Sequence, residues 1–408
     1  MTAPPPADTR ARAGDAREVF RTFLRLGLTS FGGPIAHVGY MRGECVVRRG
    51  WLDEARFAQL VALCQFLPGP ASSQLGFALG LSRAGWRGGL AAFVAFTLPS
   101  ALAMSAFALL LPWLSAGRWL PPVVAGLKLL AVAVVAHGVA GMARTLAADL
   151  PRASIAIAAA ILVLAAPAGA WLQLAAIALG AGAGLALRGN AIAPHPGRLP
   201  LPHSRRVALW LLATWLALLA FALALPAPQS PGPASVFTAF YRAGSLVFGG
   251  GHVVLPLLHD AVVEPGWIDT GTFLAGYGAA QAVPGPMFTL AAYLGASLHG
   301  PLPAGVLAMI ALFAIFLPGL LLVAAALPLQ ARLAGWPAAA RAMAGVNAAV
   351  VGLLAAAFYD PVWREGIRGP ADLAIAAVAL VLLASRRVPV PVVVLWCVGA
   401  SLAAFAAR

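Results

Sequence analysis

The residues best suited to chemistry in this chain are glycines and prolines grouped in short motifs. Residues 68–70 and 284–286 both read Pro-Gly-Pro, and residues 31–34 and 248–251 read Phe-Gly-Gly-Pro and Phe-Gly-Gly-Gly. Glycine lets the backbone approach a ligand closely, and proline suits the first turn of a helix, where its missing N–H needs no partner. A helix that begins at such a break directs free N–H groups and the positive end of its dipole toward it. These motifs predict an anion-binding site.

Polar residues beside the breaks extend this prediction. Serines and a glutamine follow Pro70, a threonine follows Pro286, a glutamine stands three positions before each Pro-Gly-Pro, and a histidine follows each glycine motif. The alternatives are an ordinary proline kink and a satisfied core histidine. The predicted anion ligands are Gly32, Gly33, Pro34, His37, Gln65, Pro68, Gly69, Pro70, Ser72, Ser73, Gly249, Gly250, Gly251, His252, Gln281, Pro284, Gly285, Pro286 and Thr289, with Gln74 as a further donor.

Three basic residues inside apolar stretches complete the candidate site. Lys128, the only lysine, lies eight residues into the apolar segment 120–143, and Arg25 and Arg242 occupy matched positions in two short segments. A cation at membrane depth is costly and usually functional. We therefore expect Lys128 to help hold a dianion. Snorkelling to the interface is the alternative for Lys128, and anchoring is the alternative for the two arginines.

The composition shows which solvent surrounds these motifs. Hydrophobic residues make up 61% of the 408 positions and charged residues only 10%, and the mean hydropathy is +0.89. Such a chain belongs in a lipid bilayer, which excludes a soluble enzyme, a secreted disulfide scaffold and a nucleic-acid-binding role for the net charge of +14. The three cysteines match no metal motif, and no Walker A loop or nucleophile elbow is present. We expect no enzymatic activity and no cofactor.

The chain is an internal repeat. Residues 46–70 and 262–286 align without a gap and are identical at 10 of 25 positions. The flanks agree as well: Gly27 pairs with Gly244, Pro99 with Pro318, and Gly126 with Gly345. We therefore predict a disordered tail over 1–15, one repeat over 16–190, a linker over 191–233 with one transmembrane helix, and a second repeat over 234–408.

Each repeat begins with apolar stretches too short to cross a membrane. In the first repeat they are 18–30, 35–47, 53–67 and 71–82, separated by the glycine and proline motifs. Helices of 12–15 residues span about 18–22 Å, less than the roughly 30 Å hydrocarbon core. Each pair should therefore enter and leave on one side as a re-entrant hairpin. Four longer apolar segments follow in each repeat.

Arginine placement predicts that the repeats have inverted topology. Arginines in loops mark the cytoplasmic side. Loop 42–56 carries four arginines, whereas its repeat partner, 251–270, carries no lysine or arginine. This fits an all-α polytopic membrane protein of nine full crossings with a cytoplasmic N-terminus. The linker helix turns the second copy over, as in many secondary transporters.

Residues 31–80 resemble the chromate ion transporter family, and so do the second Phe-Gly-Gly motif and the stretch from Gly266 to Ala296. The resemblance covers nearly the whole chain and is closest to the long, two-domain members. It implies a bacterial inner-membrane exporter of chromate, with sulfate as the look-alike oxyanion. Gly251 departs from the first copy, which has Pro34 at that position.

Energetics favour export of a dianion. With the cell interior negative, moving one negative charge outward gains about 2.3 kcal/mol per 100 mV, and a dianion gains about twice that. Proton coupling is then not required. An oxyanion channel and a transporter of another anion such as sulfate stay open as alternatives. A homodimer stays open too.

Overall fold

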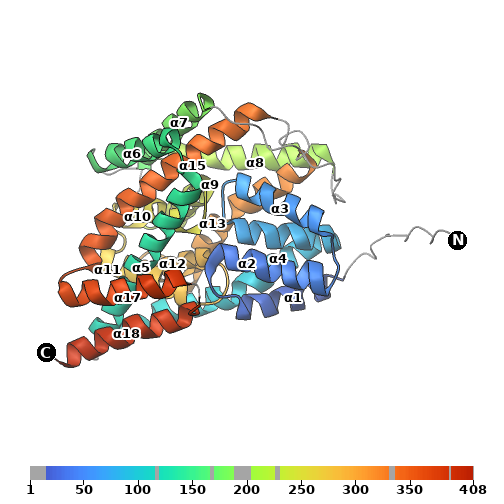
Figure 1. The fold of residues 1–408 in the computed structure, drawn as a ribbon. Helices are drawn as coiled ribbons and strands as arrows, with labels where there is room; N and C mark the ends of the chain where they lie inside the picture. Colours follow the sequence, from blue (N-terminus) through green and yellow to red (C-terminus); the bar gives the residue numbers. More distant parts are fainter. Residues whose placement is uncertain are drawn as a thin grey trace, which may run out of the picture.

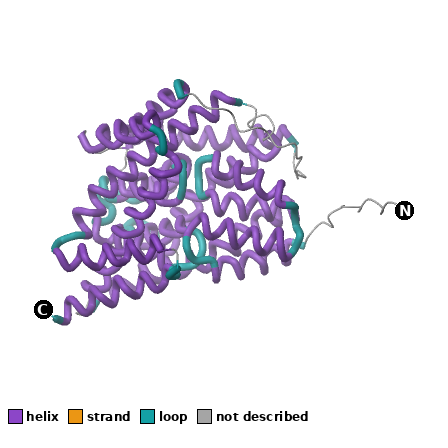
Figure 2. The backbone as a smooth tube through the Cα atoms, in the orientation of Figure 1, coloured by secondary structure: helices purple, strands orange, loops and turns teal. Residues whose placement is uncertain are grey.

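The computed structural model describes residues 15–114, 119–165, 170–187, 204–225, 230–329, 336–385 and 387–407. Within these ranges the chain is helical and has no β-strand, as Figure 2 shows. The predicted all-α fold is therefore confirmed for the described chain. Most of the predicted tail (1–14) and much of the predicted linker (191–203 and 226–229) lie outside the described residues.

The first hairpin of repeat one consists of α1 (Ala16–Thr29), α2 (Gly33–Met41) and the wider π-helical turn η1 (Arg42–Arg48). The Asp15 side chain starts α1 by accepting a hydrogen bond from the Arg17 N–H. Gly32 and Gly33 separate the helices with φ of +99° and +76°, a region that residues with a Cβ rarely enter. The break therefore falls at the predicted glycines.

The second hairpin consists of α3 (Glu54–Phe66) and the beginning of α4 (Ala71–Leu114). Gly69 lies between them with φ of +118°. Helix α4 is interrupted at Ala84 and Gly85, where the backbone leaves helical geometry. It is therefore a short returning helix followed by a long one, as the short apolar segment 71–82 and the longer segment after it predict.

Repeat two follows the same plan with different details. Its first hairpin is α9 (Pro233–Leu246), the 3-10 turn η2 (Gly251–Val253) and α10 (Val254–Val262). The second is α11 (Thr270–Ala282), η3 (Met287–Thr289) and α12 (Leu290–Ser297). Gly249, Gly250 and Gly285 again supply positive φ at the breaks.

The longer helices follow the hairpins. They are α5 (Leu120–Leu146), α6 (Leu150–Ala165), α7 (Ala170–Leu185), α8 (Arg205–Ala224), α13 (Ala304–Ala326), α15 (Pro337–Ala357), α17 (Pro370–Ser385) and α18 (Val390–Ala406), with the short turns η4 (Leu327–Leu329), η5 (Phe358–Trp363) and α16 (Arg364–Gly366). Five stretches of the described chain are long and apolar enough to cross a membrane: they lie in α4, α5, α8, α13 and the run from α15 to α16. Helices α6, α7, α17 and α18 have 16–17 residues, about 24 Å. Nine full crossings therefore stay a prediction.

The two repeats interlock. Helix α5 of repeat one packs against α17 and α18 of repeat two, and α15 of repeat two packs against α6 and α7 of repeat one. The paired glycines allow this close approach: Gly126 lies against the backbone of Val398, and Gly345 against Gly180 and Gly184. The long helices of each repeat therefore pack against those of the other in both directions.

The hydrophobic interior forms two separate clusters. One joins α1, α2, α3 and the first part of α4 to the end of α13, and the other contains α5, α9–α12, α15, α17 and α18. Figure 1 shows α1–α4 at one end of the array and α17 and α18 at the other. The hairpins of repeat one thus share one core with the end of α13 from repeat two.

Candidate substrate site at the helix breaks

The two Pro-Gly-Pro breaks are bound crosswise to the opposite repeats. The Gly69 N–H donates to the Val247 carbonyl at 2.7 Å, and the Gly285 N–H donates to the Ser30 carbonyl at 2.9 Å. Ser30 and Val247 occupy equivalent positions, directly before the two Phe-Gly-Gly motifs. These N–H groups, expected to face an anion, therefore bind the other repeat instead.

The two glycine turns also lie together. A Cβ at Gly251 would lie 3.3 Å from the Pro34 ring, so the two copies of the motif are in contact. Together with the crosswise bonds, this places all four breaks in one group, which we call the break cluster: residues 30–34, 68–70, 247–251 and 284–286. At this cluster both repeats present their half-helix ends to each other.

Both central glycines lack room for a side chain. A Cβ at Gly69 would lie 3.0 Å from the Gly319 Cα, and one at Gly285 would lie 2.8 Å from the Ser100 Oγ. Gly319 and Ser100 follow the repeat-paired residues Pro318 and Pro99. Each Pro-Gly-Pro break therefore packs on the long helix of the opposite repeat.

His37 belongs to this cluster. Its Nε2 lies 3.1 Å from the Ser30 carbonyl, which also receives the Gly285 N–H. A carbonyl only accepts, so Nε2 carries the hydrogen. The imidazole is 1% exposed and lies edge-on against Phe96, with 5.4 Å between ring centroids. Its second nitrogen, Nδ1, is buried and has no hydrogen-bond partner among the described residues.

Other polar atoms near the breaks are also buried without a hydrogen-bond partner among the described residues. Within the described chain, the Oγ atoms of Ser30 and Ser73, the Oε1 of Gln74 and the Oδ1 of Asn347 are buried without a hydrogen-bond partner. The Gln74 amide donates to the Pro68 and Gly319 carbonyls, and Asn347 Oδ1 lies 3.4 Å from where a Gly249 Cβ would be. Buried polar atoms are nearly always paired, so such a group indicates a site for water or a polar ligand.

Several predicted ligands have partners of their own or point elsewhere. The Thr289 hydroxyl donates to the Pro286 carbonyl at 2.8 Å, and Gln281 contacts the sulfur of Met287. His252 Nδ1 lies 2.9 Å from the Tyr277 hydroxyl. Gln65 has an exposed side chain. Ser72 is buried at the first turn of α4, where helix geometry leaves N–H groups without a helical partner.

The structure does not bring the three basic residues to the cluster. Lys128 is buried beside the start of α11 and pairs with Glu365, with 3.6 Å between Nζ and Oε2. Helix α11 is 13 residues long, so roughly 20 Å separate that end from the break at its other end. The Arg242 guanidinium donates to the Ala222 carbonyl in the last turn of α8, and Arg25 is exposed.

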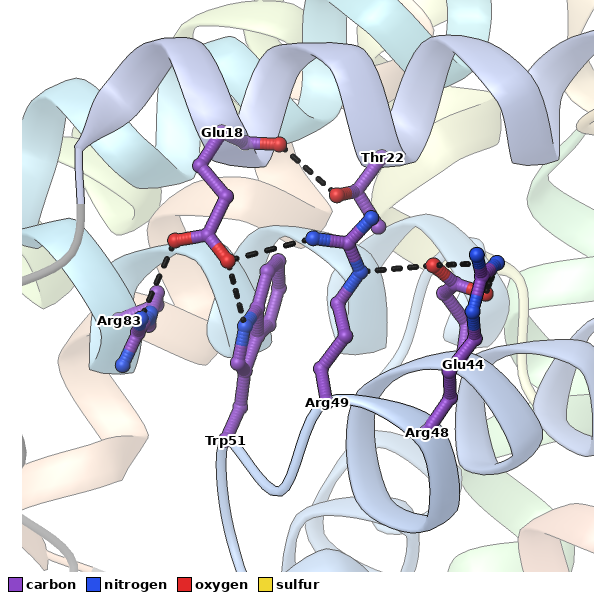
Figure 3. A network of polar contacts seen from close by, with 7 residues as sticks. All are labelled: Glu18, Thr22, Glu44, Arg48, Arg49, Trp51 and Arg83. Carbon is purple, nitrogen blue, oxygen red and sulfur yellow. Dashed lines mark hydrogen bonds and ion pairs between the residues drawn. The ribbon is translucent and has the colours of Figure 1, made fainter.

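The other ends of the repeat-one hairpins meet in a polar network (Figure 3). The Glu18 carboxylate in α1 accepts hydrogen bonds from Arg49 and the Trp51 indole at 3.2 Å and from Arg83 at 3.1 Å. Arg49 also binds Glu44 at 2.7 Å. The start of α1, the end of η1 and the end of the short returning helix of α4 therefore lie on one face. This is the geometry expected of two re-entrant hairpins.

The loop side of this network holds an ionised carboxylate. Burial raises the pKa of Glu44, but hydrogen bonds from Arg49 and Arg48 lower it by more, so its pKa lies below the ordinary glutamate value. The carboxylate accepts from Arg48 at 3.0 Å and from Arg49 at 2.7 Å. Arg49 thus joins η1 to α1 within the first hairpin, and Arg83 of α4 joins the second hairpin to the first through Glu18.

Comparison with known proteins assigns this chain to a family. The family model described as "Chromate transporter" matches residues 17–185 and 234–403, once for each repeat. The chain belongs to the chromate transporter family. It is 30% identical to a chromate transport protein of Pseudomonas aeruginosa over 84% of this chain and 80% of that protein. It is 28% identical to one of Cupriavidus metallidurans over 97% and 96%, and 27% identical to a probable one of Synechococcus elongatus over 93% of each. No solved structure gives a significant match.

The residues that close the cluster were not predicted from the sequence. Ser30 and Val247 contribute backbone carbonyls, and Ser100 and Gly319 provide the packing surfaces. Their only sequence signal is position: each stands next to a repeated motif residue. Asn347, which stands at the repeat position equivalent to Lys128, lies beside the second glycine turn. The apolar helices of the described chain agree with a multi-pass membrane protein.

Proposed function

We propose that this chromate transporter exports chromate across the bacterial inner membrane and binds the oxyanion at the break cluster. The observation that carries the proposal is the pair of buried serine hydroxyls without partners among the described residues, on Ser30 and Ser73, beside the first turn of α4. A tetrahedral oxyanion accepts hydrogen bonds in several directions. The hydroxyls of Ser30 and Ser73 can turn to donate to it. The first-turn N–H groups of α4 can donate to it as well.

The protonation state of His37 affects how well the site accepts an anion. Because Nε2 donates to Ser30, Nδ1 of the neutral ring presents a lone pair, which repels an anion. A protonated ring presents Nδ1–H, which favours the anion. Binding of the oxyanion therefore favours proton uptake at His37. Proton coupling is not needed to drive export, because the membrane potential already favours the outward movement of a dianion.

The crosswise bonds suit alternating access. The repeat-one hairpins and the end of α13 share one hydrophobic core, and Gly69–Val247 and Gly285–Ser30 join the hairpins to the rest of repeat two at the break cluster. Rocking of one body against the other about these contacts would open the cluster to one face at a time. We propose that the Arg-rich loop 42–56 faces the cytoplasm and 251–270 the opposite side, so that the repeats are inverted.

Flux in inverted membrane vesicles tests the proposal. Vesicles containing the chain should accumulate labelled chromate, faster when the lumen is made positive, and added sulfate should compete if the site takes both oxyanions. Saturable flux stimulated by oxyanion on the far side marks a transporter. Linear flux without such stimulation would mark a channel and contradict the proposed mechanism.

Two glycine variants connect this flux to the break cluster. Gly69→Leu and Gly285→Leu should abolish it, because the side chain meets Gly319 or Ser100 and a backbone with φ above +100°. The matched controls are Gly141→Leu and Gly399→Leu, at helical glycines with open space around the Cβ position. Normal export by well-expressed Gly69→Leu and Gly285→Leu variants would refute the site.

A further inference from the structure

Three metal-ligand side chains converge at the end of α10, away from the break cluster. Ligand atoms of His259, Asp260 and Glu264 all lie within 4.8 Å of one another. The His259 Nδ1 is 4.0 Å from Asp260 Oδ1 and 3.8 Å from Glu264 Oε1. These separations are too long for hydrogen bonds but close to those between donors that share one metal ion.

The local backbone and neighbours hold two of these side chains in place. The Val263 and Glu264 N–H groups both donate to the His259 carbonyl, at 2.8 and 3.3 Å, which turns the chain so that Glu264 returns toward the imidazole. The His259 ring lies edge-on against Phe273 with 5.5 Å between centroids. Gln173 of α7 donates to Asp260 Oδ2 at 2.7 Å, which leaves Oδ1 on the histidine side. Such outer contacts orient ligands in metal sites.

The charge balance around the triad favours a cation. His259 and Asp260 side chains are only 12% and 13% exposed. The two nearby basic residues form ion pairs with other acidic residues: Arg364 pairs with Asp360 at 2.7 Å and Lys128 with Glu365 at 3.6 Å. An open cavity of about 450 Å³ lies beside the triad. It is lined by His259 and Glu264, by Asp360, Arg364 and Glu365, and by Val263, Thr270 and Pro361. Among the residues described here, no lysine or arginine pairs with the Asp260 or Glu264 carboxylate.

We propose that His259, Asp260 and Glu264 bind one divalent transition-metal ion, with Zn²⁺ as the best match. One imidazole nitrogen and two carboxylate oxygens suit Zn²⁺ and its neighbours in the first row, whereas Mg²⁺ and Ca²⁺ prefer all-oxygen sites. The fourth position opens to the cavity and takes water. Because Gln173 belongs to repeat one, its hydrogen bond to Asp260 supports the site across the contact between α10 and α7. The site does not depend on the proposed oxyanion site.

Zinc binding to the purified full chain tests this site. The protein is prepared in detergent with an affinity tag that lacks histidine, stripped with a chelator, and titrated with Zn²⁺ in a calorimeter. We expect one ion per chain and no competition from Mg²⁺. His259→Gln and Glu264→Gln should each weaken binding more than Gln173→Leu, which should weaken it about 10- to 100-fold as an orienting residue.

The chain offers a matched control for these variants. His299 is an exposed histidine in the loop after α12, and His299→Gln should bind Zn²⁺ as the unmodified chain does. Glu264 is 41% exposed, so its replacement keeps the test available if His259→Gln does not fold. Absence of saturable binding, or binding that survives both His259→Gln and Glu264→Gln, would overturn the proposal.

Discussion

Replacing Ser73 by alanine separates substrate binding from stability at the break cluster. Ser73 is 2% exposed in the first turn of α4, and its Oγ is one of the buried atoms without a hydrogen-bond partner in the described chain. Ser73→Ala therefore removes no hydrogen bond from the folded protein. It removes a buried unpaired hydroxyl, whose burial costs about 1–3 kcal/mol. We expect thermal stability to stay the same or rise.

Binding should respond in the opposite direction. If the Ser73 hydroxyl donates to a bound oxyanion, the lost bond to a charged acceptor is worth about 1.5–3 kcal/mol. At about 1.4 kcal/mol per factor of ten, chromate affinity should fall about 10- to 150-fold. The measurement is the half-saturation concentration for chromate in vesicle flux, together with the melting temperature of the purified variant.

A second serine on the same helix provides the control. The Ser82 Oγ donates to the Ala78 carbonyl at 2.8 Å, within the helix itself. Ser82→Ala should leave chromate affinity unchanged. The reasoning is refuted if Ser73→Ala keeps normal affinity, or if it loses as much stability as affinity, since the hydroxyl would then serve folding.

Three other predictions concern the remaining charged groups. Single cysteines at Arg48 and Glu264 should be labelled from opposite sides of the membrane, against a background of native cysteines that are all buried; labelling from one side would contradict inverted repeats. Lys128→Met should leave chromate affinity unchanged, because Lys128 pairs with Glu365 rather than with the break cluster, and a fall in affinity measured by flux would restore it to the site. The lowered pKa of Glu44 means that its stabilising effect is present above the ordinary glutamate pKa of about 4.3 and is lost as the pH falls through its lower folded-state pKa. Glu44→Gln should therefore lower the melting temperature at neutral pH and flatten its decline in acid, and an unchanged acid profile would show that Glu44 does not contribute.

The positions of the helix breaks were predictable from the sequence. Six of the seven glycines in the motifs have φ between +76° and +140°; Gly251, the departure from the Pro34 pattern, does not. A positive φ is a property of one residue and its neighbours, because only glycine lacks the Cβ that clashes there. The short helices on either side of each break follow from the same local rules.

The role of the paired glycines required the tertiary structure. Gly27 and Gly244, like Gly126 and Gly345, lie where two helix backbones touch, so their repetition reflects packing and not a ligand. In the sequence these glycines look the same as those at the breaks. Only the neighbouring helix distinguishes a glycine that permits contact from one that bends the chain.

The sequence by itself determined that the chain lies in a membrane, that it is a repeat of two, and where each half-helix stops, because hydropathy, identity and backbone preference are all read along the chain. The tertiary structure decided which ends meet. It paired Gly69 with Val247 and Gly285 with Ser30, and it placed Lys128 beside Glu365. These partners are separated by about 180 to 255 positions, and their contact depends on how the two repeats pack against each other, which no local pattern records.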